Sequence, residues 1–453
     1  MGTIIRRAYK TELDPNREQR RMLARCCGAV RWVYNRALAR RRELYETEGA
    51  TARPRTLNRE LTLWKQEESW LYEVPNCALQ EAFRDLDAAF QHFLRRVKQG
   101  GEKPGYPRFR ARGRDPGRFT LRGSIAVEHG HIKLPWVRGH TLGRMRLKER
   151  GYLPQGRFVN HVAGVPSDQQ VRAQFVNGVR VLSATVSERA GRWFVSLQVE
   201  QEAETATPKG APLGVDLGIG QLAVCSDGTA FDNPKALSKL ERKLRRLQKE
   251  FGRRHAPIHR QPGEADEHYR RRREQWSKSR NLKRPGEPLS ANAKRTADKV
   301  ARLHYRIACV RRNAAHQATH RIVQHREPSQ LVIEDLNVAG MLQNRRLSKA
   351  LSDAGMREVR RQLEYKADWN GTEVIHADRW FPSTKHCPRC GSVKAAMSLS
   401  ERLYRCEHCG FEVGRDLGAA LSLLSLAAKP ADSLNACGEG GSQGSPGEAG
   451  SGL

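Results

Sequence analysis

Apolar and polar positions at the start of the chain first alternate and then recur with the period of a helix. Residues 3–13 (TIIRRAYKTEL) alternate, which predicts a strand. Apolar residues then step by three and four, which predicts a helix that begins at Asp14 or Asn16. These apolar residues are Met22, Cys26, Val30 and Val33. More helix is predicted over residues 78–99.

Between residues 119 and 200 the pattern changes to short alternating runs separated by turn residues. The runs are RFTLRG, HIKLPW, RMRLK, VRVLSATVSE and RWFVSLQVE. They predict a small antiparallel barrel or sheet. The segment before them, residues 100–119, interleaves arginine and aromatic residues with glycine and proline. That composition suits phosphate contact and base stacking, but it also fits an ordinary basic loop.

Residues 204–212 have the composition of a linker, and a new domain begins with two apolar strands over 213–228. Two amphipathic helices follow at 236–251 and 291–325. Their apolar seams could pair with each other or with another chain. The polar stretch between them contains Arg270, Arg271, Arg272 and Arg273, and we expect a mobile segment there that is a candidate nucleic-acid arm.

The last third of the chain predicts an alternation of strands and helices. Residues 331–335 (LVIED) have the apolar character of a buried parallel strand. A helix over 352–371, a strand over 372–378 and a final helix over 416–428 follow. Residues 429–453 are rich in glycine and serine, and we expect them to be disordered.

Composition favours a polyanionic partner. The 453 residues are enough for about two to four domains, and 81 Lys and Arg against 49 Asp and Glu give a net charge of +32. So large an excess repels itself unless a partner such as nucleic acid neutralises it. No apolar run reaches the ~18 residues of a membrane-spanning helix, and no secretory signal follows Met1.

Ten cysteines are spread thinly along the chain, which argues against a disulfide framework and predicts a reducing, intracellular compartment. Six of them follow no ligand spacing: Cys26, Cys27, Cys77, Cys225, Cys309 and Cys437. We expect the first five to be small buried hydrophobic residues.

The other four cysteines predict a structural zinc site. Cys387 and Cys390, then Cys406 and Cys409, form two Cys-x-x-Cys pairs separated by fifteen residues. Gly391 and Gly410 follow the pairs, where each knuckle must turn. Four thiolates fill a tetrahedron and leave no open position for catalysis. His386 and His408 flank the pairs and are weaker candidate ligands.

Three acids stand where phosphodiester chemistry would need them. Asp216 lies in the first apolar strand of the new domain, Glu334 ends the strand LVIE, and Asp416 begins the last helix. Gly214 and Gly218 flank Asp216 and could allow close approach of a phosphate backbone. Adjacent strands would bring the acids together, and clustered carboxylates favour two Mg²⁺ ions. Taken singly, each acid is more often a helix cap or an ion-pair partner, and it is the order Asp, Glu, Asp on strand, strand and helix that favours a joint site.

The motifs resemble those of TnpB (OrfB), the transposon-associated RNA-guided nuclease family related to compact type V CRISPR effectors. LGVDLGIGQLAVCSDG resembles its first RuvC motif, and LVIEDLNVAGML with NRRLSKALSDAG its second. RWFPSTKHCPRCG, CEHCG and RDLGAALSLL resemble its zinc ribbon and third motif. REQRRMLARCCGAVRWVYNRAL and GYPRF match as well, so the likeness covers nearly the whole chain.

The resemblance implies a multidomain α+β chain with an RNase H-like (RuvC) α/β nuclease domain. By this likeness Asp216, Glu334 and Asp416 are its Mg²⁺ ligands. The implied parts are a wedge-like β-barrel (1–12 and 102–205), a helical recognition lobe (13–101), the nuclease domain (206–380 and 411–428), a zinc ribbon (381–410) and a disordered tail (429–453). Gly414, Gly418 and Ser422 depart from the family's third motif, which puts the catalytic rate in question.

The leading hypothesis is an RNA-guided DNA endonuclease encoded by or derived from a transposable element. It implies guide RNA and double-stranded target DNA as partners, no membrane, a cytoplasmic location at the prokaryotic nucleoid, and a monomer as the favoured state. The alternative is a nucleic-acid-binding regulator with weak or lost nuclease activity. A transposase of the Asp-Asp-Glu type fits less well, because its Glu comes last and Glu334 lies in the middle.

Overall fold

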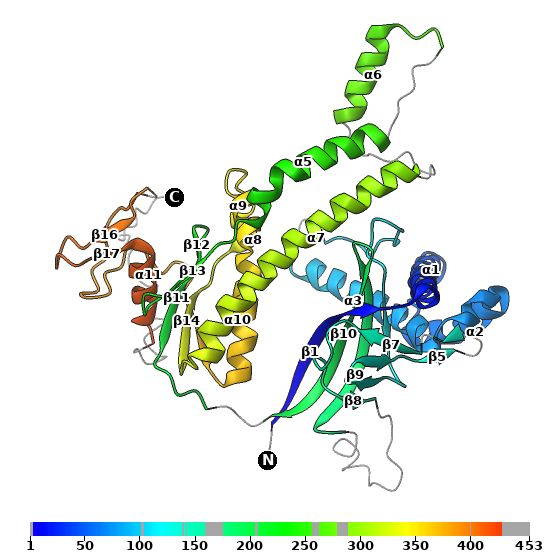
Figure 1. The fold of residues 1–453 in the computed structure, drawn as a ribbon, viewed down its shortest axis with the longest axis horizontal. Coiled ribbons are helices and arrows are strands. Elements are labelled where there is room, and N and C mark those ends of the chain that lie inside the picture. Colours follow the sequence, from blue (N-terminus) through cyan, green and yellow to red (C-terminus); the bar gives the residue numbers. More distant parts are fainter. Residues whose placement is uncertain are drawn as a thin grey trace, which may run out of the picture. The chain divides into compact units, whose positions relative to one another are not determined.

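The computed structural model describes residues 3–100, 104–137, 140–141, 143–158, 175–203, 207–255, 262–278, 289–398 and 400–427. The chain divides into two compact units, one up to residue 204 and one from residue 205 (Figure 1). The tail predicted to be disordered, residues 429–453, lies outside the described residues and includes Cys437. No helix in the described ranges combines the length and the apolar character needed to cross a bilayer.

Unit 1 contains a closed β-barrel, as the alternating runs predict. Its strands pair in the order β10-β1-β7-β4-β3-β8-β9, and β9 pairs back onto β10 to close the ring. Their bounds are β1 (Thr3–Asp14), β3 (Ala126–Glu128), β4 (His131–Lys133), β7 (Arg144–Leu147), β8 (Gly156–Arg157), β9 (Val179–Arg189) and β10 (Arg192–Ala203). β2 (Arg118–Leu121) joins β9 outside the ring, and β5 (Trp136–Val137) and β6 (His140–Thr141) form a separate hairpin.

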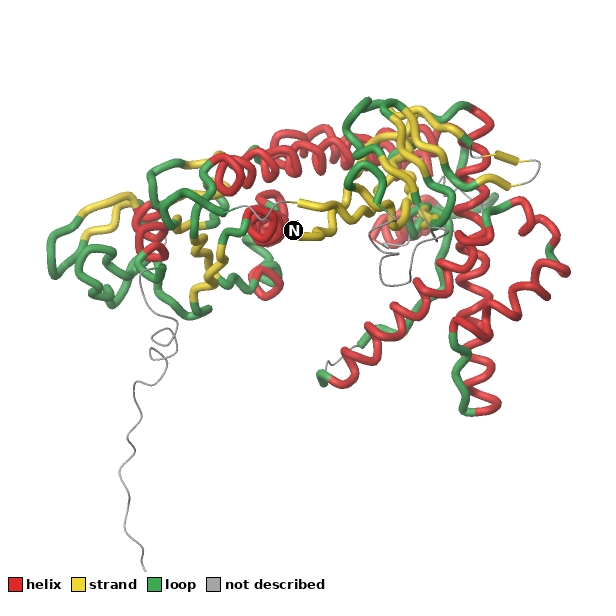
Figure 2. The backbone as a smooth tube through the Cα atoms, turned by 90° about the horizontal axis from the view of Figure 1, so that it is seen from below, coloured by secondary structure: helices red, strands yellow, loops and turns green. Residues whose placement is uncertain are grey.

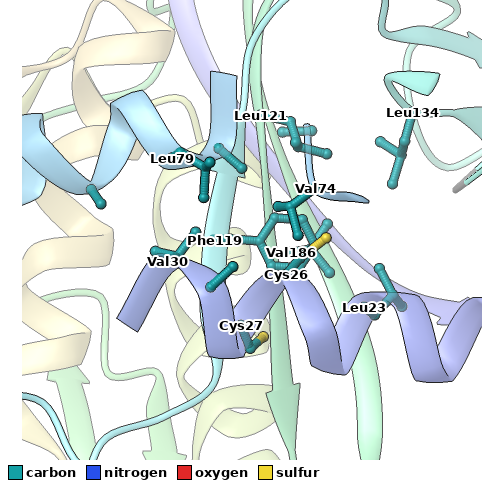
Figure 3. Packing of buried hydrophobic residues seen from close by; sticks show 14 of the residues in the cluster. Leu23, Cys26, Cys27, Val30, Val74, Leu79, Phe119, Leu121, Leu134 and Val186 are labelled. Carbon is teal, nitrogen blue, oxygen red and sulfur yellow. The ribbon is translucent and has the colours of Figure 1, made fainter. Parts of the chain in front are cut away.

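The helices of unit 1 share one core with this barrel, and α1 contributes to it the apolar face that the sequence predicts, whereas α2 and η1 were not predicted. They are α1 (Arg17–Glu48), α2 (Pro54–Glu67), the 3₁₀ turn η1 (Ser69–Glu73) and α3 (Asn76–Lys98). Of the two predicted starts for α1, Asn16 is the N-cap, and it forms a capping box with Gln19. Leu23, Cys26 and Val30 of α1 are buried in one core with residues of β2 and β9 (Figure 3).

Of the five cysteines predicted to be small buried hydrophobic residues, three are buried and two are half-buried. Cys26, Cys27 and Cys225 are buried, while Cys77 and Cys309 are half-buried. Burial raises the pKa of Cys27 to about 12, so this thiol stays protonated and unreactive at neutral pH.

Unit 2 is built on a five-stranded sheet in the order β13-β12-β11-β14-β15. The three strands β11 (Leu213–Asp216), β14 (Gln330–Glu334) and β15 (Glu373–Ala377) run parallel, while β12 (Gln221–Cys225) and β13 (Ala230–Asp232) are antiparallel. Helix α11 (Arg415–Leu424) covers one face of the sheet, and α10 (Met356–Asn370) with the end of α7 covers the other (Figure 1).

The two amphipathic helices of unit 2 pair with each other within the chain. Leu244 and Leu247 of α5 (Ala236–His255) form a small core with Leu303 and Ile307 of α7 (Ala291–Thr319). A π-helical turn, η2 (His320–His325), extends α7 as far as the sequence predicts. The apolar faces of the two helices therefore cover each other, and no second copy of the chain is needed to bury them.

One helix was not predicted, and one predicted helix is divided in two. The stretch expected to be mobile contains helix α6 (Asp266–Lys278), which includes all four arginines from 270 to 273. The helix predicted over 352–371 is divided into α9 (Ser348–Ala354) and α10 at Gly355, whose φ of 69° lies in the left-handed region that ends helices. A short helix, α8 (Val338–Met341), precedes them.

Candidate active site and zinc ribbon

Strand alternation places Asp216 and Glu334 on the same face of the sheet. β11 and β14 are parallel neighbours in which Val215 is paired with Ile333, and each acid is the next residue along its strand. Successive side chains of a strand point to opposite faces. Val215 and Ile333 belong to the core under α7 and α10, so Asp216 and Glu334 face the side covered by α11.

Gly214 brings the third acid to this place. A Cβ atom at Gly214 would lie 2.1 Å from the carbonyl oxygen of Ala420, so only glycine lets α11 pack against β11 at this distance. Asp416 precedes Ala420 by about one helical turn and begins the helix at the end near Asp216. The sequence suggested that Gly214 leaves room for a phosphate backbone, but the backbone of α11 fills that space.

Gly218 has a similar explanation. A Cβ there would lie 2.9 Å from the carbonyl oxygen of Gln221, within the turn that connects β11 to β12. Both glycines that flank Asp216 therefore serve packing inside the chain.

The three acids interact electrostatically. Burial, then the carboxylates of Glu334 and Asp416, raise the pKa of Asp216 to about 7 from its ordinary 3.8, and Arg415 partly opposes this rise. Burial also raises the pKa of Glu334, which a hydrogen bond from the Ser383 hydroxyl opposes. The site is thus a half-buried acidic cluster, and its three carboxylates do not form a metal-sized group of the kind that the four cysteines form.

The neighbouring acid Asp335 has a structural role. Its carboxylate pairs with Arg360 at 2.7 Å and with Arg379 at 2.6 Å, and hydrogen bonds from both lower its pKa. The pattern LVIED does not reveal which of the two acids faces the cluster. The parallel register settles this, because the alternation sends Glu334 to the α11 face.

The four cysteines come together as predicted. Their sulfur atoms all lie within 4.8 Å of one another, with 3.7 Å between Cys387 and Cys409 and 3.6 Å between Cys390 and Cys406. A tetrahedral zinc ion with Zn–S bonds of about 2.3 Å requires sulfurs about 3.8 Å apart, so the group fits zinc. Within the described part of the chain, no histidine or carboxylate completes a group of this kind, so His386 and His408 are not ligands in this arrangement.

The backbone of the ribbon has the knuckle geometry that its glycines imply. The amide of Gly391 donates to the carbonyl of Cys387 at 2.9 Å, and Gly410 donates to Cys406 at 3.0 Å. Both glycines have positive φ, 76° and 69°. The rest of the ribbon is mostly loop, with one strand pair formed by β16 (Leu403–Arg405) and β17 (Glu412–Gly414) (Figure 2).

Two residues that depart from the family motif hold the ribbon on α11. The hydroxyl of Ser422 is fully buried and donates to the carbonyl of His386 at 2.8 Å, one residue before the first cysteine of the cluster. A Cβ on Gly418 would lie 2.9 Å from a methyl group of Val413 in β17. The helix that carries Asp416 is therefore also the base of the ribbon, which the sequence alone did not indicate.

The basic segment of unit 1 combines arginine with aromatic rings. The guanidinium of Arg42 lies 5.1 Å from the ring centre of Tyr106 and 4.8 Å from that of Phe109, and both rings are exposed. Arg110 is instead held by Asp85 at 3.0 Å. The chemistry for base stacking and phosphate contact is present, and nucleic-acid binding here remains a prediction.

Three family models match parts of the chain. Residues 1–50 match a "Helix-turn-helix domain", residues 194–345 match a "Probable transposase", and residues 357–423 match a "Cas12f1-like, TNB domain". In the structure, the described residues of the first segment form strand β1 and the single helix α1.

Similar proteins span nearly the full chain. A Streptomyces pristinaespiralis protein named "Putative RNA-guided DNA endonuclease" is 32% identical, over 96% of this chain and 92% of its own length. "Putative RNA-guided DNA endonuclease InsQ" of Escherichia coli (strain K12) is 28% identical, over 95% and 94%. Among solved structures, "Cryo-EM structure of the Cas12f1-sgRNA-target DNA complex" aligns at 10% identity and a TM-score of 0.47, over 93% and 99%.

Proposed function

Because this chain belongs to the TnpB (OrfB) family, we propose that it is an RNA-guided DNA endonuclease of a transposable element. We assign phosphodiester hydrolysis to a RuvC-like centre formed by Asp216, Glu334 and Asp416. One observation carries the assignment: two half-buried acids on adjacent parallel strands lie near an acid at a helix start, and together with burial these neighbours raise the pKa of Asp216 to about 7.

The donor set suits Mg²⁺. Carboxylate oxygens are the ligands that this hard cation prefers, and a bound cation would offset the repulsion from Glu334 and Asp416 that helps to raise the pKa of Asp216. A pair of Mg²⁺ ions held by these carboxylates would supply activation of water and stabilisation of the leaving oxygen. The chain itself fixes the direction of Glu334 through Ser383, and Arg415 hydrogen-bonds Asp416 at 3.1 Å.

The partners follow from the relatives and from charge. Relatives that match over most of their length are named RNA-guided DNA endonucleases, and a net charge of +32 suits binding of RNA and DNA together. We propose that the guide reads the target by base pairing while the protein reads a short motif beside it, in the bacterial cytoplasm. The barrel of unit 1 would act as the wedge and its helices as the recognition lobe.

The cysteine ribbon would be structural. Zinc at four thiolates has no open position, so its role in this proposal is to stiffen the segment between β15 and α11. The departures at Gly418 and Ser422 are compatible with activity, because both residues pack the ribbon against α11 and neither is one of the three acids.

The test is to co-express the chain with its native flanking sequence, sequence the RNA that co-purifies, and program cleavage of a matching target. We expect a discrete RNA and Mg²⁺-dependent cleavage that is lost in Asp216→Ala and Glu334→Ala. Asp232→Ala, an exposed acid at the end of β13, is the matched control and should cleave normally. If the unaltered chain binds its target with a guide RNA but does not cut it, the result favours the regulator alternative. If no discrete RNA co-purifies, the proposal that the protein is RNA-guided is refuted.

A further inference from the structure

Trp380 is the most solvent-exposed large hydrophobic side chain among the described residues, at 85%. An indole left in water forgoes the stabilisation that burial of its large apolar surface supplies. Five other tryptophans whose side chains the structure describes are half-buried or buried. They are Trp32, Trp64, Trp70, Trp193 and Trp369. An indole that the fold leaves uncovered in this way is suited to covering by a partner.

The place of Trp380 in the chain puts it near the acidic cluster. β15 ends at Ala377, which is paired in register with Glu334 of β14. Trp380 follows three residues later, in the loop that leads from this sheet edge to the zinc ribbon. The tryptophan therefore emerges beside the strand ends that carry the acidic cluster.

The loop around Trp380 is fastened on both sides. Its own amide donates to the carboxylate of Asp378 at 2.8 Å, and Arg379 pairs with Asp335 at 2.6 Å. The ring of Phe381 packs into the core between the sheet and α11, and Ser383 donates to Glu334. The backbone is thus held by the same residues that fix the site, while the indole points away from the protein core.

A tryptophan on a held backbone has only two side-chain torsions, so it loses little conformational entropy when a flat partner stacks on it. Bases of single-stranded nucleic acid stack on such rings without regard to sequence. A strand that enters a RuvC-like centre must be unpaired locally, so its bases are available for stacking.

Resting on the proposed nuclease function, we propose that Trp380 stacks on a base of the target DNA strand and so holds the scissile phosphate at the three acids. It is a substrate-positioning residue. Its loss should slow the cutting step more than it weakens binding of the target, because guide pairing supplies most of that binding.

The first test uses the assembled ribonucleoprotein and targets with one abasic position at a time around the cut site. Wild type should lose about tenfold in single-turnover rate at one or two adjacent abasic positions, as expected for one lost stack. Trp380→Ala should be about tenfold slower on intact DNA and insensitive to those positions, and Trp380→Phe should recover most of the rate. Leu403→Ala, which removes an exposed apolar side chain of the ribbon, is the control and should match wild type.

Three outcomes would overturn the proposal. The first is a Trp380→Ala variant that cuts as fast as wild type. The second is a variant that cuts more slowly but stays as sensitive as wild type to abasic positions in the DNA. The third is a wild-type protein whose rate depends on abasic positions in the guide RNA and not on those in the DNA. The second outcome would indicate a purely structural role.

A second readout does not depend on cleavage. In the Asp216→Ala background, 2-aminopurine is placed at one position of the target strand at a time. It should be quenched at one or two adjacent positions, and its fluorescence there should recover when Trp380 is also replaced by alanine. If wild type fails to cut any target, the proposed function fails, and this fluorescence still decides whether Trp380 stacks on the strand. Unchanged fluorescence between the two proteins would refute stacking.

Discussion

Gly214 and Ala420 are in direct backbone contact, since a Cβ on Gly214 would lie 2.1 Å from the carbonyl oxygen of Ala420. The second-closest atom to such a Cβ is the amide nitrogen of Leu424, at 2.7 Å, so the whole of α11 would have to move. This contact sets the distance between the strand that carries Asp216 and the helix that carries Asp416.

Gly214→Ala is therefore expected to damage both stability and catalysis. Overpacking of this kind costs about 1–3 kcal/mol, and displacement of α11 would move Asp416 away from Asp216. Thermal unfolding and single-turnover cleavage measure the two effects. Gly220→Ala is the matched control, because a Cβ there meets no atom within 4 Å. Equal behaviour of the two variants would contradict the packing argument.

The raised pKa of Asp216 predicts an unusual dependence of stability on pH. Its carboxyl titrates at about 7 in the folded protein and at 3.8 ordinarily, so the folded state holds an extra proton between these values. This residue therefore contributes stability below about pH 4 that is lost as pH rises toward 7. In the metal-free protein, Asp216→Asn should raise the unfolding temperature at pH 8 much more than at pH 4.5.

Metal should compete with that proton. Cleavage at low Mg²⁺ should rise as pH passes through about 7, and more Mg²⁺ should move the midpoint of this rise to lower pH. A midpoint that does not change with Mg²⁺ concentration would show that Asp216 is not a metal ligand.

Local sequence patterns were sufficient for the elements but not for the contacts between them. The apolar runs and the Asn16 cap predict β1 and α1, and the run LVIE predicts β14 as a buried parallel strand. They could not show that Gly214 contacts Ala420, because that contact joins residues about two hundred positions apart. Nor could they show the hydrogen bonds of Ser383 and Ser422, which join residues 49 and 36 positions apart.

Helix α6 was missed for a different reason. It has almost no apolar periodicity, and its helical character is supported by polar pairs one turn apart. Glu267 and Arg271 are such a pair, at 2.7 Å, and Glu264 just before the helix pairs with Arg272 at 2.6 Å. A search based on hydrophobic spacing does not detect a helix of this kind.

Cys406→Ser should impair cleavage without removing any of the three acids. The variant loses one of four zinc ligands, and the ribbon is anchored to α11 through Ser422 and the contact of Gly418 with Val413. Zinc content should fall well below one per chain, and cleavage should fall with it. Ser422→Ala is the companion variant: it should keep its zinc but lose about 1–3 kcal/mol of stability, because a buried carbonyl loses its partner. Full activity in zinc-free Cys406→Ser would contradict this link.

Asp353 should be a major stabilising residue of unit 2, away from the acidic cluster. Its buried carboxylate accepts the backbone amides of Leu237 and Ser238 at the start of α5 and pairs with Arg311 of α7 at 2.7 Å. Asp353→Ala leaves Arg311 without this partner and should cost about 3–5 kcal/mol. Asp353→Asn should cost less, since its amide oxygen can still cap α5. Glu241→Ala, which breaks a more exposed pair with Lys349, should cost at most about 1 kcal/mol, and unfolding curves compare the three.

Glu334 and Asp335 are adjacent acids that should respond in opposite ways to neutralisation. Glu334 is largely buried on the α11 face, where its charge is disfavoured, so Glu334→Gln should fold at least as well as wild type in the absence of metal. If Glu334 holds Mg²⁺, the same change should reduce the cleavage rate by about a thousandfold. Asp335→Asn loses its ion pairs with Arg360 and Arg379, which are partly exposed, so it should cost about 1 kcal/mol of stability and keep cleavage within about tenfold. Unfolding and single-turnover measurements on this pair separate the two roles. Loss of cleavage in Asp335→Asn with normal folding would show that the metal-binding acid had been assigned to the wrong position.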